Sequence, residues 1–352
     1  MTVNIWLNKG FSQTMDAVQL IRKHVRDSAV MVSHDDETAA ALSVADKVIG
    51  EPEIEMGRSL SPEDYAFWCS EVVRNNEIDV FIVQRHQRAI SASREMFAPL
   101  PCKIIVPAGP FTLDTVKDKW RFSHACQNAG LPIPKTRLAT DLSSFDQALS
   151  EVENDGIACV KPTHGVFASG FFVLSRMSSF LKGLGEIETR TLPTHIYRMA
   201  LVENPEEIRP TLVMEYLAGP EWSVDLVCDN GIVIAGAVRY KQGFAQRIDA
   251  NERLLWLARE TVRSFELSGL INIQMRATDE TEKDIRLLEI NPRMSGGIGY
   301  ASAADVHLPA IAVQHALGRE ITGARYPASP VMVRPINIAI PVGRLFSTPE
   351  FA

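Results

Sequence analysis

The chain contains 352 residues, of which 46% are hydrophobic and 22% are charged, and its formal net charge is -7. These values are ordinary for a globular protein, and the length allows two or three domains with sizeable hydrophobic cores. The acidic balance argues against a broad binding surface for nucleic acids or anionic membranes, although it allows a local basic pocket.

The cysteines and the N-terminus indicate the cellular compartment. The five cysteines are scattered and show no C-x-x-C spacing, a pattern typical of reduced thiols in the cytoplasm. The N-terminal residues do not resemble a signal peptide, and no apolar run approaches the length of a membrane span. We therefore expect a soluble, cytoplasmic protein.

Roughly the first hundred residues alternate between short apolar runs and amphipathic segments. Helices are expected at 14–25 and 62–72, the second with Ser61 as its cap and Pro62 in its first turn. Strands are expected at 3–7, 29–33, 47–49, 79–83 and 103–106. This alternation predicts a parallel, doubly wound sheet, whose ligands bind beyond the carboxyl ends of the strands.

The segments at those carboxyl ends are polar. Residues 8–10 follow the first strand, and residues 84–88 follow the strand at 79–83. The pattern leaves the roles of Arg85 and Arg88 open. The first strand is not followed by G-x-G-x-x-G, the glycine turn that lets a pyrophosphate approach the backbone. A dinucleotide-dependent oxidoreductase is therefore disfavoured.

Beyond a proline-punctuated linker at 107–110, the pattern is mixed. Helices are expected at 115–129, 143–153, 251–267 and 310–317, and Gly130 ends the first of them. Strands are expected at 157–160, 171–174, 212–215, 222–228, 232–237, 271–276 and 285–290. Asn230 and Gly231, between two apolar runs, predict a tight β-hairpin turn.

The end of the last strand carries the most informative sequence. Glu289 and Asn291 are two residues apart, so a strand places both side chains on one face. Pro292 ends the strand because it has no N–H for a ladder, and Arg293 and a Ser-Gly-Gly turn follow. Two oxygen ligands beside a guanidinium suit a site for Mg²⁺ and phosphate. The simpler alternative is a strand that ends in a polar turn.

Together with a lysine at a strand end, Lys161, and the acidic hinge at 213–225, this segment carries a family resemblance. Residues 117–317 resemble the ATP-grasp superfamily, of the carboxylate–amine ligase type, with a carbamoyl-phosphate-synthetase-like ATP-grasp unit. The resemblance implies an α/β protein in which an N-terminal parallel-sheet, pre-ATP-grasp domain precedes a two-lobed α+β ATP-grasp domain.

The resemblance also implies domain boundaries. The Rossmann-like pre-ATP-grasp domain is expected at 1–108 and the ATP-grasp domain at 109–325. Within the latter, the small lobe is expected at about 157–217. The segment 326–352 is expected to pack on the large lobe.

The implied phosphate contacts come from two lysines, an arginine and a loop. In members of the family, lysines at the positions of Lys119 and Lys161 contact the ATP phosphates, and Lys161 is also expected to be catalytic. Arg293 is expected at the γ-phosphate or an acyl phosphate, where charge develops during transfer. The loop at 163–170 is expected to cover the phosphates, although His164 departs from the glycine-rich pattern of relatives.

The implied nucleoside contacts come from the hinge. Where the strand breaks after residue 216, free backbone groups are available for the edge of an adenine. By position, Glu215 and Leu217 are expected to supply main-chain contacts. Glu221 is expected to accept hydrogen bonds from the ribose hydroxyls.

The implied metal ligands are Gln274, Glu289 and Asn291. Mg²⁺ usually keeps waters and substrate phosphates among its ligands, so two or three protein oxygens are sufficient. Arg239 and Lys241 follow the strand at 232–237. They either face the same cavity or form a solvated strand end, and the sequence does not decide between these alternatives.

The resemblance implies an ATP-dependent ligase that forms a C–N bond, with ATP and Mg²⁺ (or Mn²⁺) as cofactors. It activates a carboxylate as an acyl phosphate and joins it to an amine, releasing ADP and phosphate. The partners are small-molecule substrates, without nucleic acid or membrane, and a homodimer is the commonest assembly of such soluble proteins. The alternatives are a bicarbonate-activating carboxylase or carbamoyl-type enzyme, and a non-catalytic ATP-binding regulatory protein. Substrate identity is not decoded by the expected specificity loops at 8–10, 84–88 and 295–300.

Overall fold

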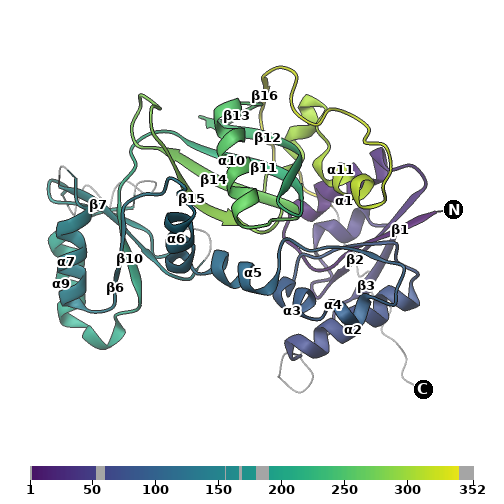
Figure 1. The fold of residues 1–352 in the computed structure, drawn as a ribbon, viewed down its shortest axis with the longest axis horizontal. Coiled ribbons are helices and arrows are strands. Elements are labelled where there is room, and N and C mark those ends of the chain that lie inside the picture. Colours follow the sequence, from purple (N-terminus) through teal and green to yellow (C-terminus); the bar gives the residue numbers. More distant parts are fainter. Residues whose placement is uncertain (1, 53–59, 155, 166–168, 180–189, 341–352) are drawn as a thin grey trace. The chain divides into compact units, whose positions relative to one another are not determined.

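The computed structural model describes residues 2–52, 60–154, 156–165, 169–179 and 190–340 (Figure 1). The chain forms two compact units. The first contains residues 1–113, 222–273 and 290–352, and the second contains residues 114–221 and 274–289. Within the described ranges, no helix combines the length and the apolar character needed to cross a membrane. The domain boundaries proposed from the sequence stay a prediction.

The first unit contains the expected parallel sheet. Its five strands lie in the order β3-β2-β1-β4-β5, and all neighbours are parallel. The strands are β1 (Val3–Leu7), β2 (Ser28–His34), β3 (Lys47–Gly50), β4 (Val80–Ile82) and β5 (Lys103–Ile105). The helices that accompany them are α1 (Gln13–His24), α2 (Pro62–Asn75), α3 (Gln87–Ala92) and α4 (Arg94–Phe97), with a 3-10 turn at Ala40–Val44. The α/β class predicted from the sequence is confirmed.

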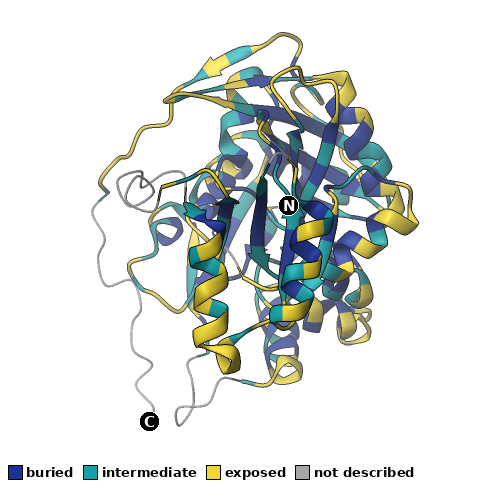
Figure 2. Ribbon diagram, turned by 90° about the vertical axis from the view of Figure 1, so that its left-hand side faces the viewer, coloured by how far each residue is buried: buried dark blue, intermediate teal, exposed yellow. Residues whose placement is uncertain are grey.

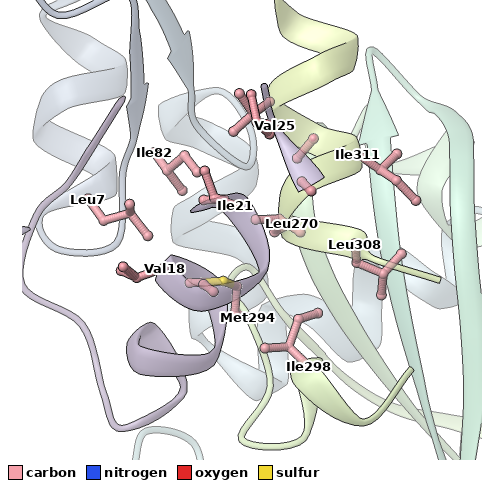
Figure 3. Packing of buried hydrophobic residues seen from close by; sticks show 14 of the residues in the cluster. Leu7, Val18, Ile21, Val25, Ile82, Leu270, Met294, Ile298, Leu308 and Ile311 are labelled. Carbon is pink, nitrogen blue, oxygen red and sulfur yellow. The ribbon is translucent and has the colours of Figure 1, made fainter. Parts of the chain in front are cut away.

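The strands of this sheet send their side chains alternately into two cores. Ile5 and Leu7 of β1 belong to the core on the α1 side, whereas Trp6 belongs to the core on the α2 side. Trp6 stacks on Phe81 of β4, with ring centroids 4.1 Å apart. Figure 3 shows the first core, where α1 and the strands meet side chains that include Met294. The helices α1 and α2 therefore cover opposite faces, as in a doubly wound sheet.

The start of α2 follows the sequence signal. The Ser61 Oγ accepts a hydrogen bond from the N–H of Asp64 at 3.1 Å, and Pro62 occupies the first turn. This cap satisfies one of the N–H groups that a helix start leaves without a partner in the helix.

The second unit is built around a five-stranded sheet in the order β6-β10-β7-β8-β9. Its strands are β6 (Thr136–Ala139), β7 (Ile157–Pro162), β8 (Phe172–Ser175), β9 (Thr191–Pro193) and β10 (Thr211–Glu215). Two helices, α7 (Leu142–Val152) and α9 (Thr194–Glu203), contact each other and the sheet (Figure 1). Phe145 and Leu149 of α7 pack against Val160 and Val213 in the core between the helices and the sheet.

The single helix predicted at 115–129 is wrong, because the structure has two helices there. They are α5 (Pro110–Lys117) and α6 (Lys119–Asn128). Asp118 separates them with extended backbone angles, and its carboxylate accepts hydrogen bonds from the N–H groups of Trp120 and Arg121 at 2.9 and 3.1 Å. An aspartate side chain competes with the helix for these donors and starts a new helix instead.

A six-stranded sheet has the order β15-β14-β11-β12-β13-β16. Its strands are β11 (Glu221–Asp229), β12 (Ile232–Gln242), β13 (Ala245–Asp249), β14 (Gly269–Ala277), β15 (Ile285–Asn291) and β16 (Val331–Val333). The remaining helices are α10 (Glu252–Ser264) and α11 (Leu308–Ala316), with 3-10 turns at Pro205–Glu207 and Ile298–Ala304. Figure 2 shows that the strands are largely buried and that the helices expose one side.

The predicted hairpin turn between β11 and β12 is confirmed. Asn230 and Gly231 have positive φ angles of 45° and 82°, which a two-residue turn between antiparallel strands requires. The turn starts the antiparallel pairing, an irregularity between Val227 and Cys228 shifts its register, and beyond that point Ser223 lies opposite Arg239. Opposed residues share a face, so this register decides which polar residues of β11 and β12 can meet.

Candidate active site

Glu289 is paired with Lys161 in the second unit. Lys161 lies near the end of β7, and its Nζ donates to Oε2 of Glu289 on β15 at 2.9 Å. The two side chains are only 22% and 24% exposed, so each charge needs the other to offset the loss of water. The structure therefore brings together a predicted phosphate ligand and a predicted metal ligand.

Lys119 joins this pair from the start of α6. Its backbone N–H donates to the carbonyl of Thr163, and its Nζ donates to the carbonyl of Gly165, both at 3.0 Å. Burial lowers the pKa of the Lys119 ammonium, the nearby charge of Lys161 lowers it further, and Glu289 opposes both effects. The two lysines and the carboxylate therefore form one electrostatic cluster.

A pocket that is partly open to solvent lies beside this cluster in the second unit. Lys119 and Lys161 line it together with apolar side chains, which include Ile133, Leu212, Met214, Leu287 and Leu288. An apolar pocket with two ammonium groups suits a flat heterocycle that carries an anionic chain.

The predicted hinge is irregular, as expected. At the end of β10, the backbone N–H of Glu215 donates to the carbonyl of Lys135 at 2.9 Å. The Oε2 of the Glu215 side chain accepts from the backbone N–H of Lys135 at 3.1 Å. Backbone pairing resumes at Ala218, whose N–H donates to the carbonyl of Thr278 at 3.0 Å. Leu217, between them, is buried. The N–H of Glu215 is therefore engaged. Its carbonyl accepts a weak hydrogen bond from Cys159 Sγ at 3.7 Å and has a second lone pair that suits a ligand.

Arg276 is a hinge residue that the sequence reasoning missed. Its Nε donates to the carbonyl of Gly219 at 2.9 Å, and its guanidinium lies over the ring of Tyr216, 5.6 Å from the centroid. Its Nη1 lies 3.7 Å from Oε2 of Glu221. Strand alternation was the available signal, because Arg276 lies two residues beyond Gln274 on the same face of β14.

Glu221, the predicted ribose ligand, keeps 47% of its side chain exposed. Desolvation raises the pKa of its carboxyl above the ordinary value, and the charge of Glu289 raises it further. The cations of Arg276 and Lys161 oppose these effects. Glu221 is thus coupled electrostatically to the cluster around Lys161.

Asn291 and Arg293 belong to the first unit and contact each other. The Nη2 of Arg293 donates to Oδ1 of Asn291 at 3.3 Å, and its Nη1 donates to the carbonyl of Met294 at 3.3 Å. The guanidinium also lies 5.3 Å from the centre of the Phe11 ring. The arginine therefore adjoins the predicted metal ligand, as the sequence indicates.

Arg239 and Lys241 were expected either to face the cavity or to form a solvated strand end, and the structure places the two residues differently. Arg239 is buried, and its Nε donates to Oδ2 of the fully buried Asp225 at 2.5 Å. Its Nη2 donates to Oγ of Ser295 at 2.9 Å. Lys241 lies two residues further along β12 and is exposed. Asp225, together with its partner Asn272, was missed because neither position carries a distinctive local motif.

The loops that follow β1 and β4 meet at the carboxyl edge of the parallel sheet. The Oδ1 of the buried Asn8 accepts from the N–H of Gln84 at 2.6 Å. Lys9 pairs with Asp35, and the Nη1 of Arg85 lies 3.2 Å from the same carboxylate. Two of the expected specificity loops are therefore held together by polar contacts.

The predicted phosphate-covering loop is described only in part. The Oγ1 of Thr163 lies 3.1 Å from Nδ1 of His164. Residues 166–168 lie outside the described residues, so the closure of the loop over phosphate stays a prediction.

The predicted metal ligands have the right donor chemistry for Mg²⁺. Gln274, on β14, is half-buried and follows the same face of the strand as Asn272. Glu289 and Asn291 share a face of β15, the neighbour of β14 in the sheet. Each of the three side chains offers a hard oxygen, and a single carboxylate suits a cation that keeps phosphate and water as further ligands.

A family model described as "ATP-grasp in the biosynthetic pathway with Ter operon" matches residues 207–339. Among curated proteins, the carbamoyl phosphate synthase large chain of Clostridium botulinum (strain Loch Maree / Type A3) is 23% identical over 348 residues, covering 86% of this chain and 31% of that protein. The corresponding protein of Lachnoclostridium phytofermentans is 24% identical over 315 residues, covering 84% of this chain and 26% of that protein. The chain thus spans between a quarter and a third of the length of these relatives.

Solved structures agree with this likeness over almost the whole chain. N5-carboxyaminoimidazole synthetase from Staphylococcus aureus, complexed with ADP, has a TM-score of 0.68 at 13% identity, covering 94% of this chain and 82% of that one. The biotin carboxylase domain of Hydrogenobacter thermophilus 2-oxoglutarate carboxylase, complexed with MgADP, ADP and bicarbonate, has a TM-score of 0.65 at 11% identity, covering 94% and 74%. Such identities establish the fold alone, and together with the family-model match they confirm the predicted resemblance of this chain to ATP-grasp proteins.

Proposed function

We propose that the protein is an ATP-dependent ligase that activates a carboxylate as an acyl phosphate and joins it to an amine. The observation that supports this most directly is the 2.9 Å contact between Lys161 Nζ and Glu289 Oε2. It holds a cation suited to phosphate beside a carboxylate suited to Mg²⁺, next to an apolar pocket for a nucleobase.

The nucleotide is bound by residues of the second unit. The adenine enters the apolar pocket beside Lys119 and Lys161. Its edge is bonded by the carbonyl of Glu215 and the N–H of Leu217. Glu221 accepts hydrogen bonds from the ribose hydroxyls. Lys119 and Lys161 neutralise the phosphates, because a compact ammonium can approach several anionic oxygens.

Gln274, Glu289 and Asn291 hold Mg²⁺, or Mn²⁺ in its place. An ion held by these residues would supply positive charge that offsets the negative charge of the phosphates. Lys161, which now compensates Glu289, is then available to the phosphate.

The chemistry has two steps. An oxygen of the substrate carboxylate attacks the γ-phosphorus, the bond to the bridging oxygen of ADP breaks, and an acyl phosphate forms. The amine nitrogen then attacks the acyl carbon, phosphate leaves, and the nitrogen loses a proton to give an amide. Arg293 and Lys161 stabilise the charge on the transferred phosphoryl group, where preorganised cations lower the barrier most.

Activation of bicarbonate, for carboxylation or carbamoyl transfer, is the second candidate. One observation favours it: the structural likeness to a biotin carboxylase domain whose crystal holds bicarbonate. Both candidates begin with the same phosphoryl transfer to a carboxylate oxygen. They differ in the acid that receives the phosphate.

Release of ADP, measured against a panel of carboxylic acids, amines and bicarbonate, tests the proposal. Release that requires one acid and one amine supports the ligase, whereas release that requires bicarbonate supports the second candidate. Tight ATP binding without release under any condition would instead indicate a regulatory nucleotide-binding protein. We further propose that the protein acts on small molecules in the cytoplasm, with a homodimer as the simplest assembly.

A further inference from the structure

A line of polar side chains crosses four neighbouring strands within the first unit. Each strand contributes one residue, in the order of the strands in the sheet: Asn291 on β15, Asn272 on β14, Asp225 on β11 and Arg239 on β12. Asn291 Nδ2 donates to Asn272 Oδ1 at 3.3 Å, and Asn272 Nδ2 donates to Asp225 Oδ1 at 2.9 Å. Arg239 Nε donates to the other oxygen of Asp225 at 2.5 Å.

The residues in the middle of this line are buried. Asp225 is 0% exposed, Asn272 is 2% exposed and Arg239 is 9% exposed. Buried polar groups must satisfy one another, because an unpaired donor or acceptor there costs about 1–3 kcal/mol. The direction of each hydrogen bond is therefore determined by what each group can donate or accept.

Asp225 determines the directions of the hydrogen bonds along this line. A carboxylate that is paired with a guanidinium accepts hydrogen bonds and does not donate them. The amide of Asn272 must therefore turn its NH₂ group toward Asp225 and its oxygen away. That oxygen also accepts only, so the amide of Asn291 must turn its own NH₂ group toward Asn272.

The last amide consequently has a defined orientation. Its Oδ1 points away from Asn272, and the Nη2 of Arg293 donates to it at 3.3 Å. If the amide were reversed, its oxygen would face the oxygen of Asn272 and its NH₂ group would face the arginine. Both of these contacts would be repulsive, and the residue would have no oxygen to offer to a cation.

We propose that Asp225 and Asn272 are positioning residues that orient the Asn291 amide so that its oxygen, not its nitrogen, is presented to a divalent cation. This inference rests on the proposed function, in which Asn291 is a metal ligand. Unlike an aspartate, an asparagine ligand is neutral, and only one of its two terminal atoms can bind a metal. A metal site that uses asparagine therefore needs outer residues to select that atom.

A double-mutant cycle isolates this role. Asn272→Leu is similar in size and cannot orient an amide, whereas Asn291→Asp has two equivalent oxygens and needs no orientation. The full-length wild type, both single variants and the double variant are titrated with Mn²⁺ in the presence of ADP, and free Mn²⁺ is followed by electron paramagnetic resonance. This measures binding of the ion without relying on turnover.

We expect Asn272→Leu to weaken Mn²⁺ binding by roughly 10- to 100-fold when residue 291 is asparagine. In the Asn291→Asp background, the same substitution should weaken binding by less than about twofold. Gln246→Leu is the matched control, because Gln246 accepts from Nη1 of Arg239 at 2.9 Å on the side away from Asn291. It should leave Mn²⁺ affinity within about twofold of wild type.

Three results would contradict the inference or its basis. An equal loss of affinity in both backgrounds would mean that Asn272 supports the structure without orienting the ligand, and no loss in either would also overturn the role. If the wild type binds no Mn²⁺ with ADP, the proposed metal site itself fails. Circular dichroism checks folding, and Asn272→Ala, which leaves space instead of a buried leucine, replaces the first variant if that one does not fold.

Discussion

The Nζ of Lys161 and the Oε2 of Glu289 lie 2.9 Å apart, although 128 residues separate them in sequence. The lysine comes from β7 and the glutamate from β15. Each side chain is less than a quarter exposed, so the pair persists because each charge offsets the desolvation of the other. In the proposed reaction, phosphate pairs with Lys161 and a metal ion pairs with Glu289. The two residues therefore mark the proposed site of ATP.

The first prediction concerns the metal ligands. Glu289→Gln and Asn291→Ala should each lower the rate of ADP release by orders of magnitude, because an oxygen ligand of the ion that offsets the phosphate charge is lost or weakened. The far-ultraviolet circular dichroism should stay that of the wild type. Glu280→Gln, on an exposed turn of the unit that contains Glu289, is the control and should keep the wild-type rate. Near-normal rates in both ligand variants would refute the metal assignment.

The second prediction concerns Arg276. Arg276→Ala removes the bond to Gly219, the contact with the Tyr216 ring and the charge beside Glu221. We expect the KM for ATP to rise about tenfold, equivalent to about 1.4 kcal/mol, with little change in kcat. Arg276→Lys should have a KM for ATP between those of the wild type and Arg276→Ala, because an ammonium keeps the charge but not the planar contacts.

Steady-state kinetics with ATP and with 2′-deoxy-ATP provide the measurement for Arg276. The variant should also discriminate less between the two nucleotides, since Glu221 loses its partner. Arg286→Ala, which removes a partly exposed arginine on β15 of the same unit, should leave both constants near wild type. An unchanged KM in Arg276→Ala would exclude a role in nucleotide binding.

The third prediction concerns the pH dependence of nucleotide binding. Desolvation raises the pKa of the Glu221 carboxyl, so this group takes up a proton at a higher pH than an ordinary glutamate does. Protonation removes its negative charge, and the affinity for ATP should fall as the pH falls through that raised pKa. Glu221→Gln should bind ATP more weakly at neutral pH and show a flatter profile. Binding isotherms measured from pH 5 to 8 test this prediction. If the pH profile of Glu221→Gln were the same as that of the wild type, the assignment of Glu221 to the ribose would be contradicted.

The fourth prediction concerns stability and the stacked rings of His24 and His307, whose centroids lie 3.5 Å apart. Burial lowers the pKa of His24, and the charge of His307 and of Lys23 lowers it further, while Asp305 opposes them. The folded state therefore binds the proton less readily than the unfolded chain, whose histidine titrates near ~6.5. Stability contributed by the neutral ring is present above that pH and is lost as the pH falls toward the folded pKa.

Urea unfolding at pH 7.5 and 5.5 tests this effect. The loss of unfolding free energy on acidification should be smaller in His24→Phe than in the wild type, because phenylalanine keeps an aromatic ring without a titrating group. His195→Asn removes an exposed histidine and should leave the difference unchanged. Equal pH dependence in His24→Phe and the wild type would contradict the prediction.

The fifth prediction concerns the buried pair of Asp225 and Arg239. Asp225→Ala leaves a guanidinium that is 9% exposed without its carboxylate, and should reduce the free energy of unfolding by about 3–5 kcal/mol. Removing both charges in Asp225→Leu with Arg239→Met should recover part of this loss. A double variant less stable than Asp225→Ala would show that the two residues do not act as a charge pair. Chemical denaturation of the three proteins measures the difference.

Some elements were missed because their local signals are weak. The helix α9 (Thr194–Glu203) begins after Pro193, and no side-chain capping hydrogen bond marks its start within the described structure. The strands β6 and β9 have four and three residues, too few for an alternating pattern to stand out. Tertiary packing, rather than a strong local preference, holds such segments in place.

The sequence by itself determined the features that depend on neighbouring residues. Parallel strands and helices followed from apolar periodicity, the β11–β12 hairpin followed from Asn230 and Gly231, and the shared face of Glu289 and Asn291 followed from the pleat. The family resemblance added predicted roles for Lys119 and Lys161. All of these rest on a spacing of a few residues or on a motif that can be read along the chain.

Only the tertiary structure decided which distant residues meet. Arg239 was undecided between a cavity and a solvated strand end. Asp225 ends the hinge motif, but no role was predicted for it or for Asn272. The order of strands in the sheet places Asp225, Asn272 and Asn291 on successive neighbours. Burial then requires each polar group to find a partner. The orientation of a ligand amide is therefore a property of hydrogen bonds between strands, which no pattern along a single strand contains.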